Sequence, residues 1–190
     1  MCNERSKIIL VTGGARSGKS TFAERLAMKI SDARKAYIAT AQIFDNEMAQ
    51  RVELHRSRRG EEWITFESPF EAEKIISKIA NDFEVILFDC VTIYISNFVC
   101  NFESLDDTKK IYSELQSVVE KLIDESKKIN GKIIFVTNEV GGGIVPENKL
   151  ARIFRDCAGI ANQMIAKSAD KVYLVTAGLA VDIKKLAVNI

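Results

Sequence analysis

The sequence predicts an α/β protein, with a mostly parallel central sheet that carries helices on both faces. Two observations predict this class. Short apolar, β-branched runs alternate with amphipathic segments of helical period, and a glycine-rich stretch joins the first run to the first such segment. The 190 residues, 47% of them hydrophobic, suffice for one well-buried domain. Because no linker or repeat interrupts the pattern, we expect a single domain over residues 1–190.

Five apolar runs predict strands, at residues 8–12, 36–40, 85–89, 132–137 and 171–176. Amphipathic helices are predicted between most of them. Residues 20–30 hold apolar side chains at helical spacing, and residues 111–123 carry a continuous apolar face. A third helix is expected from Glu147 to about Lys167, since Pro146 suits a first helical turn.

Charge and cysteine content exclude several classes of partner and location. The 27 lysines and arginines nearly cancel the 26 aspartates and glutamates, so we expect no nucleic acid as a partner. The four cysteines form no C-x-x-C pair, and two lie in apolar runs typical of reduced thiols, which indicates a cytoplasmic protein. No apolar run approaches the roughly 20 residues that span a bilayer, and the first residues lack a signal-peptide core, so we expect no membrane span.

The stretch GGARSGKS fits the P-loop pattern G-x-x-x-x-G-K-[ST]. It follows a predicted strand and precedes a predicted helix, a context that favours a P-loop over an incidental glycine-rich turn. In a P-loop, backbone N–H groups and the helix N-terminus bind phosphates, Lys19 reaches the β and γ phosphates as a catalytic residue, and Ser20 holds Mg²⁺. The expected nucleotide-binding residues here are Gly13, Gly14, Ala15, Arg16, Ser17, Gly18, Lys19 and Ser20.

Residues that follow the other predicted strands form a second group of candidates, because ligands of parallel sheets bind at the carboxyl ends of the strands. Asp89 ends the VILFD run, and beside a P-loop it is expected to be the second Mg²⁺-organising group, although a strand-end cap is the alternative. Thr40, Glu67 and residues 140–148 also fall near strand ends. Their composition alone is typical of turn residues. Gly141 to Gly143 either leave room for a ligand or give the backbone conformational freedom before the helix.

The one histidine of the chain, His55, lies in the segment RVELHRSRRG. If residues 45–59 are helical, Arg51, Arg58 and Arg59 flank it one turn away. Neighbouring positive charges disfavour imidazolium, which leaves a neutral ring able to act as a nucleophile, while the arginines bind phosphate. Taken by itself, the segment fits a solvated basic helix with a surface histidine better.

A resemblance to a known family favours the nucleophile over the surface histidine. The segments GGARSGKS, YIATAQIFDNEM, RVELHRSRRGEEW and TNEVGGGIVPENKLARIFRDCAG, with the aspartate-cysteine pair after VILF, resemble the bifunctional adenosylcobinamide kinase and adenosylcobinamide-phosphate guanylyltransferase family of cobalamin biosynthesis. The resemblance spans nearly the whole chain in the same order. It departs at Gly60, where the family often has proline, and at the end, AGLAVDIKKLAVNI, which leaves the role of the carboxy-terminal segment open.

The resemblance implies two successive reactions. The family phosphorylates the hydroxyl of adenosylcobinamide and then transfers GMP from GTP to adenosylcobinamide phosphate through a guanylyl-histidine, whose position His55 matches. It implies GTP with Mg²⁺, ATP as an alternative phosphoryl donor, and a homo-oligomer, commonly a trimer. Nucleotide contacts are implied, beyond the P-loop, for Ala39, Thr40, Ala41, Arg56, Ser57, Arg58, Arg59, Glu67 and Asp89.

Two rival functions remain at this stage. One is a P-loop small-molecule kinase without guanylyl transfer, in which His55 is structural. The other is a GTP-dependent switch, but its guanine-reading motif N-K-x-D is missing, since the nearest fragment, NKLA at 148–151, lacks the aspartate. Label retained from α-labelled GTP separates the first rival from the bifunctional enzyme.

Overall fold

A seven-stranded sheet runs through the part of the chain that the computed structural model describes, residues 7–42 and 60–188. The strand order is β3-β2-β4-β5-β1-β6-β7, and all neighbours pair in parallel except β6 and β7. The strands are β1 (Ile8–Gly13), β2 (Lys35–Ala39), β3 (Trp63–Glu67), β4 (Val85–Asp89), β5 (Lys132–Asn138), β6 (Lys171–Thr176) and β7 (Leu179–Asp182).

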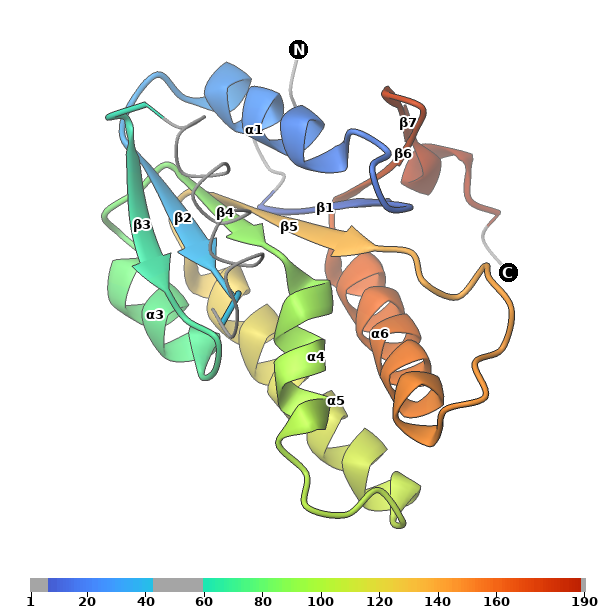
Figure 1. The fold of residues 1–190 in the computed structure, drawn as a ribbon. Helices are drawn as coiled ribbons and strands as arrows, with labels where there is room; N and C mark the ends of the chain where they lie inside the picture. The colour runs from blue at the N-terminus through green and yellow to red at the C-terminus, as the bar shows by residue number, and fades with distance from the viewer. Residues whose placement is uncertain (1–6, 43–59, 189–190) are drawn as a thin grey trace.

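Helices cover the sheet unequally on its two faces (Figure 1). One helix, α1 (Lys19–Ile30), lies on one face and contacts β1, β4 and β5. The other face carries α3 (Ala72–Ile79), α4 (Val91–Cys100), α5 (Thr108–Lys128) and α6 (Lys149–Ser168). The described helices thus lie on both faces, as expected from apolar strands that alternate with amphipathic helices.

The inner strands are apolar throughout because both of their faces are buried. Every residue of β1 is buried, and so are Val85 to Phe88 of β4. Alternate residues divide between two cores: Leu10 and Phe135 face α4 to α6, whereas Val11 and Val136 face α1. Burying each such side chain contributes about 1.5–3 kcal/mol, so the inner strands hold the sheet together.

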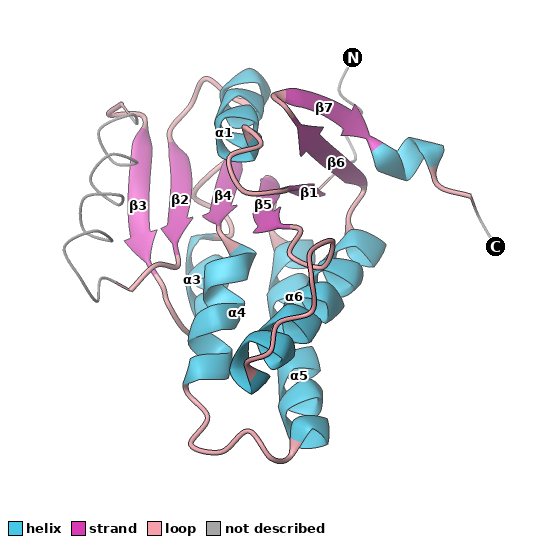
Figure 2. Cartoon of the chain, turned by 45° about the vertical axis from the view of Figure 1, so that its right-hand side comes forward, coloured by secondary structure: helices cyan, strands magenta, loops and turns pink. Residues whose placement is uncertain are grey.

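The β6–β7 edge and the short 3-10 helix η1 (Ile183–Leu186) close the described chain (Figure 2). The Lys184 ammonium donates hydrogen bonds to the carbonyl oxygens of Ala166, Lys167 and Ala169, at the last turn of α6. A cation at that end satisfies carbonyls that have no partner within the helix and offsets the negative end of its dipole. The carboxy-terminal segment is therefore tied to α6.

The five strands predicted from sequence are confirmed, with ends within one residue of the prediction. Two edge strands, β3 and β7, were not predicted, because their residues alternate between partly buried and exposed. The helix predicted from Glu147 to about Lys167 is confirmed as α6, but it begins later, at Lys149, because the Asn148 side chain caps it by accepting from the Ala151 N–H at 3.1 Å. The conditional helix at 45–59 lies outside the described residues.

Within the described ranges, no helix is both long and apolar enough to cross a bilayer.

Candidate phosphate-binding site

The predicted P-loop forms a tight connection between β1 and α1. Gly18 is the N-cap of α1, with a φ of 93°, a conformation that favours glycine. Because Gly18 has no side chain to cap the helix, the first N–H groups of α1 are left for a ligand. Together with the helix dipole they form a site for an anion at the carboxyl end of β1.

The turn between β6 and β7 packs against the P-loop and donates a hydrogen bond to it. The N–H of Gly178 donates to the Ser17 carbonyl at 2.9 Å, and a Cβ on Gly18 would lie 3.3 Å from the Gly178 Cα. At Gly13, a Cβ would collide with the Val175 carbonyl oxygen and lie 2.7 Å from the Ser17 hydroxyl oxygen. These glycines are therefore required by close packing of the loop against β6 and β7, which the motif alone did not reveal.

Lys19 lies across this loop. Its ammonium donates to the Gly14 carbonyl at 3.1 Å, and the side chain is half-buried. Desolvation lowers the pKa of Lys19, and the negative charge of Asp89 opposes that shift. Burial raises the pKa of the Cys90 thiol to about 12, so the thiol is neutral at physiological pH, and Asp89 is the anion that acts on Lys19.

Asp89 ends β4, two strands from β1 in the sheet. The Tyr37 hydroxyl, from β2, donates to its Oδ2 at 3.0 Å. The carboxylate is half-buried and close enough to Lys19 to influence the lysine's charge. The structure therefore brings together two of the residues predicted from sequence, and adds Tyr37 as a third.

No group of three or more His, Cys, Asp or Glu side chains that could hold a metal ion occurs among the described residues. A Mg²⁺ ion at this site would consequently rely on few protein oxygens, such as the Ser20 hydroxyl and the Asp89 carboxylate. The other ligands would be phosphate oxygens and water, which is how Mg²⁺ usually binds with nucleotides. The residues present fit that type of metal site.

Other predicted contacts lie further along the same edge of the sheet. The Thr40 side chain is buried, and its hydroxyl bonds both the N–H and the carbonyl of Cys90, each at 2.9 Å. It thereby links the ends of β2 and β4, while Asn97 donates to the Thr40 carbonyl at 2.8 Å. Glu67 is exposed at the end of β3, four strands from β1, or about 19 Å at the usual strand spacing. Glu67 is thus not placed beside the P-loop.

Five predicted site residues, His55, Arg56, Ser57, Arg58 and Arg59, lie outside the described residues. The strand β2 ends at Ala39, the described chain continues to Gln42, and it resumes at Gly60. Ala39 and Ala41 lie at the carboxyl end of β2, on the P-loop edge of the sheet.

A P-loop between the first strand and first helix of a parallel sheet, with an aspartate ending a nearby strand, defines a nucleoside triphosphate-binding protein of the P-loop class. A family model described as cobinamide kinase / cobinamide phosphate guanyltransferase matches residues 9–183. The chain belongs to this family, as its motifs had suggested, and is an enzyme of phosphoryl and nucleotidyl transfer.

Three similar proteins cover nearly the whole chain. The bifunctional adenosylcobalamin biosynthesis protein CobU of Escherichia coli (strain K12) is 43% identical over 93% of this chain and 99% of its own length. The Salmonella typhimurium protein of the same name is 42% identical over the same shares. CobP of Pseudomonas aeruginosa, also described as a bifunctional adenosylcobalamin biosynthesis protein, is 38% identical over 92% of this chain and 96% of its own.

Similarity to solved structures is more distant. The RadB recombinase aligns with a TM-score of 0.49 and 16% identity, over 88% of this chain and 73% of that chain. The flagellar accessory protein FlaH from Methanocaldococcus jannaschii aligns with a TM-score of 0.44 and 15% identity, over 92% and 74%.

Proposed function

We propose that the P-loop serves both reactions of the family at one nucleotide site. In the first, adenosylcobinamide is phosphorylated on its hydroxyl by GTP, with ATP as an alternative donor. In the second, GMP passes from GTP to adenosylcobinamide phosphate, which gives adenosylcobinamide-GDP and pyrophosphate. The observation that carries this proposal is the half-buried Lys19 ammonium, held over the loop at the start of α1 with Asp89 nearby.

The kinase step needs little beyond positioning and charge. The acceptor hydroxyl attacks the γ phosphorus, its proton leaves, and the bond to the β-γ bridging oxygen breaks. Lys19 and the N–H groups at the start of α1 offset the negative charge of the phosphates. Mg²⁺ held by Ser20 and Asp89 would supply further charge neutralisation.

We assign the guanylyl step to His55, because it stands where the motif of the family places its nucleophile and is the only histidine of the chain. An imidazole nitrogen attacks the α phosphorus of GTP, and the bond to the α-β bridging oxygen breaks as pyrophosphate leaves. A phosphate oxygen of adenosylcobinamide phosphate then attacks the same phosphorus and breaks the phosphorus–nitrogen bond. We assign contacts with the guanine nucleotide to Arg56, Ser57, Arg58 and Arg59, with Ala39, Thr40, Ala41 and Glu67 on the sheet edge.

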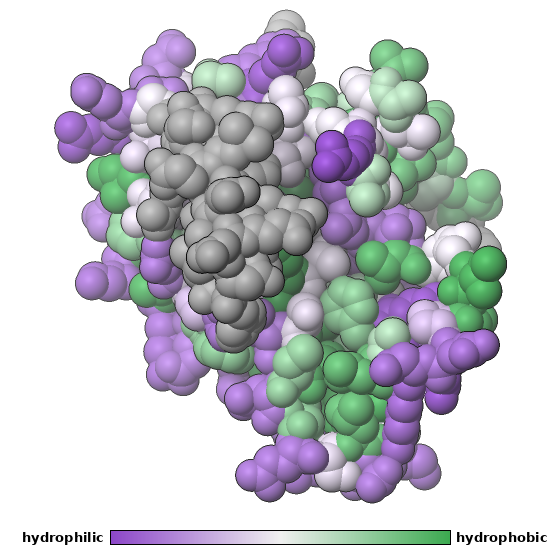
Figure 3. All heavy atoms as spheres, in the orientation of Figure 1, coloured by the Kyte–Doolittle hydropathy of each residue, from purple (hydrophilic) through white to green (hydrophobic). Residues whose placement is uncertain are grey.

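Subunit assembly and location belong to the same proposal. Apolar side chains of β7 and η1 are exposed on one corner of the molecule, including Leu179 at 74% and Leu186 at 71%. Figure 3 shows apolar atoms gathered at that corner. We infer a homo-oligomer that covers this surface, with a trimer as the expected form. The free thiols of Cys90, Cys100 and Cys157 fit a protein of the reducing cytoplasm.

The decisive experiment compares GTP labelled at the α or the γ phosphorus. Protein incubated with GTP and Mg²⁺ should retain only the α label and release pyrophosphate. The bond should break in acid and survive in alkali, because protonation of the imidazole makes it a good leaving group. His55→Ala should abolish labelling but keep kinase activity, since the P-loop remains. Full acid-labile labelling of the His55→Ala protein would refute the assignment.

A further inference from the structure

A groove of about 700 Å³ lies between α6 and the face of the sheet formed by β1 and β6. It is on the opposite face of the sheet from α1. Its floor is apolar and includes Leu10, Val172 and Ile183, whereas its rim is polar and includes Arg155 and Gln163. A volume of this size, with an apolar floor and few polar groups, is typical of a site for an organic ligand.

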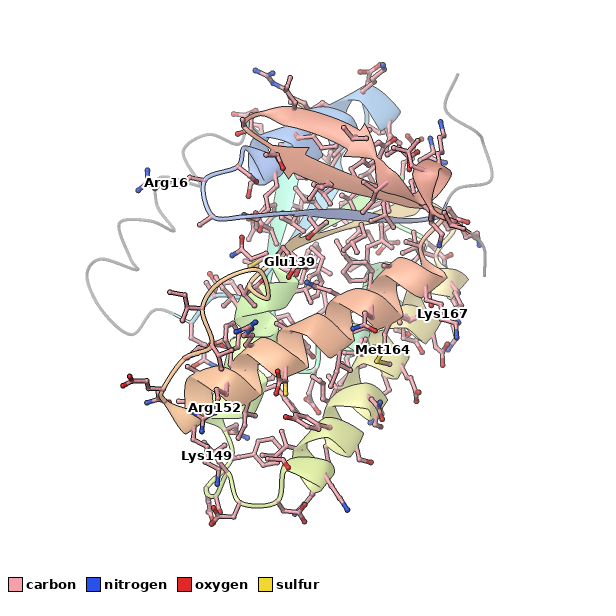
Figure 4. The ribbon with its side chains drawn as sticks, turned by 90° about the vertical axis from the view of Figure 1, so that its right-hand side faces the viewer. Arg16, Glu139, Lys149, Arg152, Met164 and Lys167 are labelled. Carbon is pink, nitrogen blue, oxygen red and sulfur yellow. The ribbon has the colours of Figure 1, made fainter. Side chains whose placement is uncertain are left out.

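The groove begins beside the P-loop. Thr12, which lines it, is followed in the chain by Gly13, the first P-loop residue. Glu139 lines it too, and its N–H donates to the Gly13 carbonyl at 3.1 Å. Figure 4 shows Glu139 between the loop that carries Arg16 and helix α6. A ligand in the groove would therefore reach from the face of the sheet to the phosphate site.

Two polar atoms in this groove lack hydrogen-bond partners among the described residues. The Thr12 hydroxyl is buried, since the residue is only 9% exposed, and it makes no hydrogen bond. Arg155 donates from Nη2 to the Gly141 carbonyl at 2.6 Å, which fixes the guanidinium, but its buried Nη1 has no partner. Unpaired buried polar atoms cost free energy, so they point to a ligand that pairs with them.

A glycine inside α6 opens the groove. Gly159 lines it, and a Cβ built there would meet no atom within 4 Å. Glycine inside a helix costs about 1 kcal/mol relative to alanine, and no packing contact of the protein requires it here. The missing side chain instead leaves space on the ligand side.

We propose that this groove binds one edge of the corrinoid acceptor, whose hydroxyl arm then extends past Thr12 to the P-loop. The inference rests on the proposed function, because that function makes a cobinamide the acceptor. A corrinoid presents methyl groups to an apolar floor and primary amides to polar atoms. Its amide oxygens accept from Arg155 Nη1, and its amide N–H groups donate to the Thr12 hydroxyl oxygen.

The test measures cobinamide binding directly, by equilibrium dialysis and the visible absorbance of the corrinoid. Gly159→Leu extends a side chain into the groove from a position where a Cβ meets no atom within 4 Å, and it should weaken binding at least ten-fold. Thr12→Val removes one hydrogen bond at constant shape and should weaken binding about five-fold. Lys167→Leu places the same side chain on α6 outside the groove, so it should bind cobinamide as the unmodified protein does. Labelling by α-labelled GTP alone should persist in Gly159→Leu and in Thr12→Val.

The outcomes separate this inference from the proposed function. If the unmodified protein bound no cobinamide, the proposed function and the groove would both be wrong. If it bound cobinamide and neither Gly159→Leu nor Thr12→Val weakened binding, only the groove would be wrong. A changed molar mass of Gly159→Leu in light scattering, with unaltered cobinamide binding, would assign the groove to a second copy of the chain and would also overturn the inference.

Discussion

Replacing Tyr37 with phenylalanine tests how the aspartate at the phosphate site is held. The Tyr37 hydroxyl donates to Asp89 Oδ2 at 3.0 Å, and the tyrosine is almost fully buried. Its ring packs edge-on against Trp63, with 6.2 Å between centroids, and phenylalanine would keep that contact. The substitution therefore removes the hydroxyl and little else.

The free energy of unfolding that Tyr37→Phe loses follows from the charge and exposure of Asp89. A hydrogen bond to a charged group contributes about 1.5–3 kcal/mol, and the half-buried carboxylate places this one near the lower limit. For a chain of this length, about 1.5 kcal/mol corresponds to a fall in Tm of about 3–6 °C. Since a partner that orients a metal ligand typically changes metal affinity 10–100-fold, we expect the Mg²⁺ concentration for half-maximal kinase rate to rise about ten-fold.

The assay is the initial rate of cobinamide phosphorylation as a function of Mg²⁺, together with thermal unfolding. Tyr173→Phe is the matched control, because the Tyr173 ring packs against Phe22 at 5.2 Å on the same face of the sheet. It should leave the Mg²⁺ requirement unchanged. A Tyr37→Phe protein of lower Tm but normal Mg²⁺ requirement would show that this hydrogen bond serves stability only and does not orient Asp89 toward a metal ion.

Two further substitutions test the phosphate site, and one thiol-labelling experiment tests the burial of the cysteines. Lys19→Ala should depress kinase and guanylyltransferase rates together, by roughly 10³-fold, and loss of only one activity would indicate two separate nucleotide sites. Asp89→Asn should raise the Mg²⁺ requirement more than Tyr37→Phe does, while an unchanged requirement would return Asp89 to a strand-end cap. Burial raises the pKa of both Cys90 and Cys157 to about 12, so in a Cys2→Ser background only the exposed Cys100 should react quickly with a thiol reagent at pH 8. Rapid native-state modification of three thiols would contradict this burial.

Local sequence patterns predict the candidate site most directly where its residues are adjacent in the chain. The P-loop is one continuous segment whose glycines, lysine and serine follow from the demands of phosphate binding, so residues 13–20 could be predicted directly. Asp89 could be predicted because it ends an apolar run. The bond from Tyr37 could not, because it depends on β2 lying beside β4, and sequence gives no strand order.

Because local patterns do not show which distant segments meet, other features of the structure could not be predicted either. Thr40 ends a run just as Asp89 does, yet its hydroxyl is used to bond the backbone of Cys90. The strand β3 pairs only with β2, and its outward residues are exposed, so it lacks the continuous apolar run that marks an inner strand. The groove beside α6 had one signal in the sequence, since Gly141, which lines it, belongs to the glycine run that could admit a ligand. Its other walls could not be predicted, because they come from β1, α6 and η1, which are distant in the chain.

The position of β1 in the sheet has a consequence for synthesis of the chain. This strand is complete once residue 13 has been made, but its two neighbours in the sheet are residues 132–138 and 171–176. At about 5–20 residues per second, a ribosome needs roughly 6–25 s to reach β5 and longer to reach β6. During that time β1 has neither of its final partners, and the P-loop lacks its hydrogen bond from Gly178. A truncated nascent chain would thus carry the P-loop sequence without the nucleotide site.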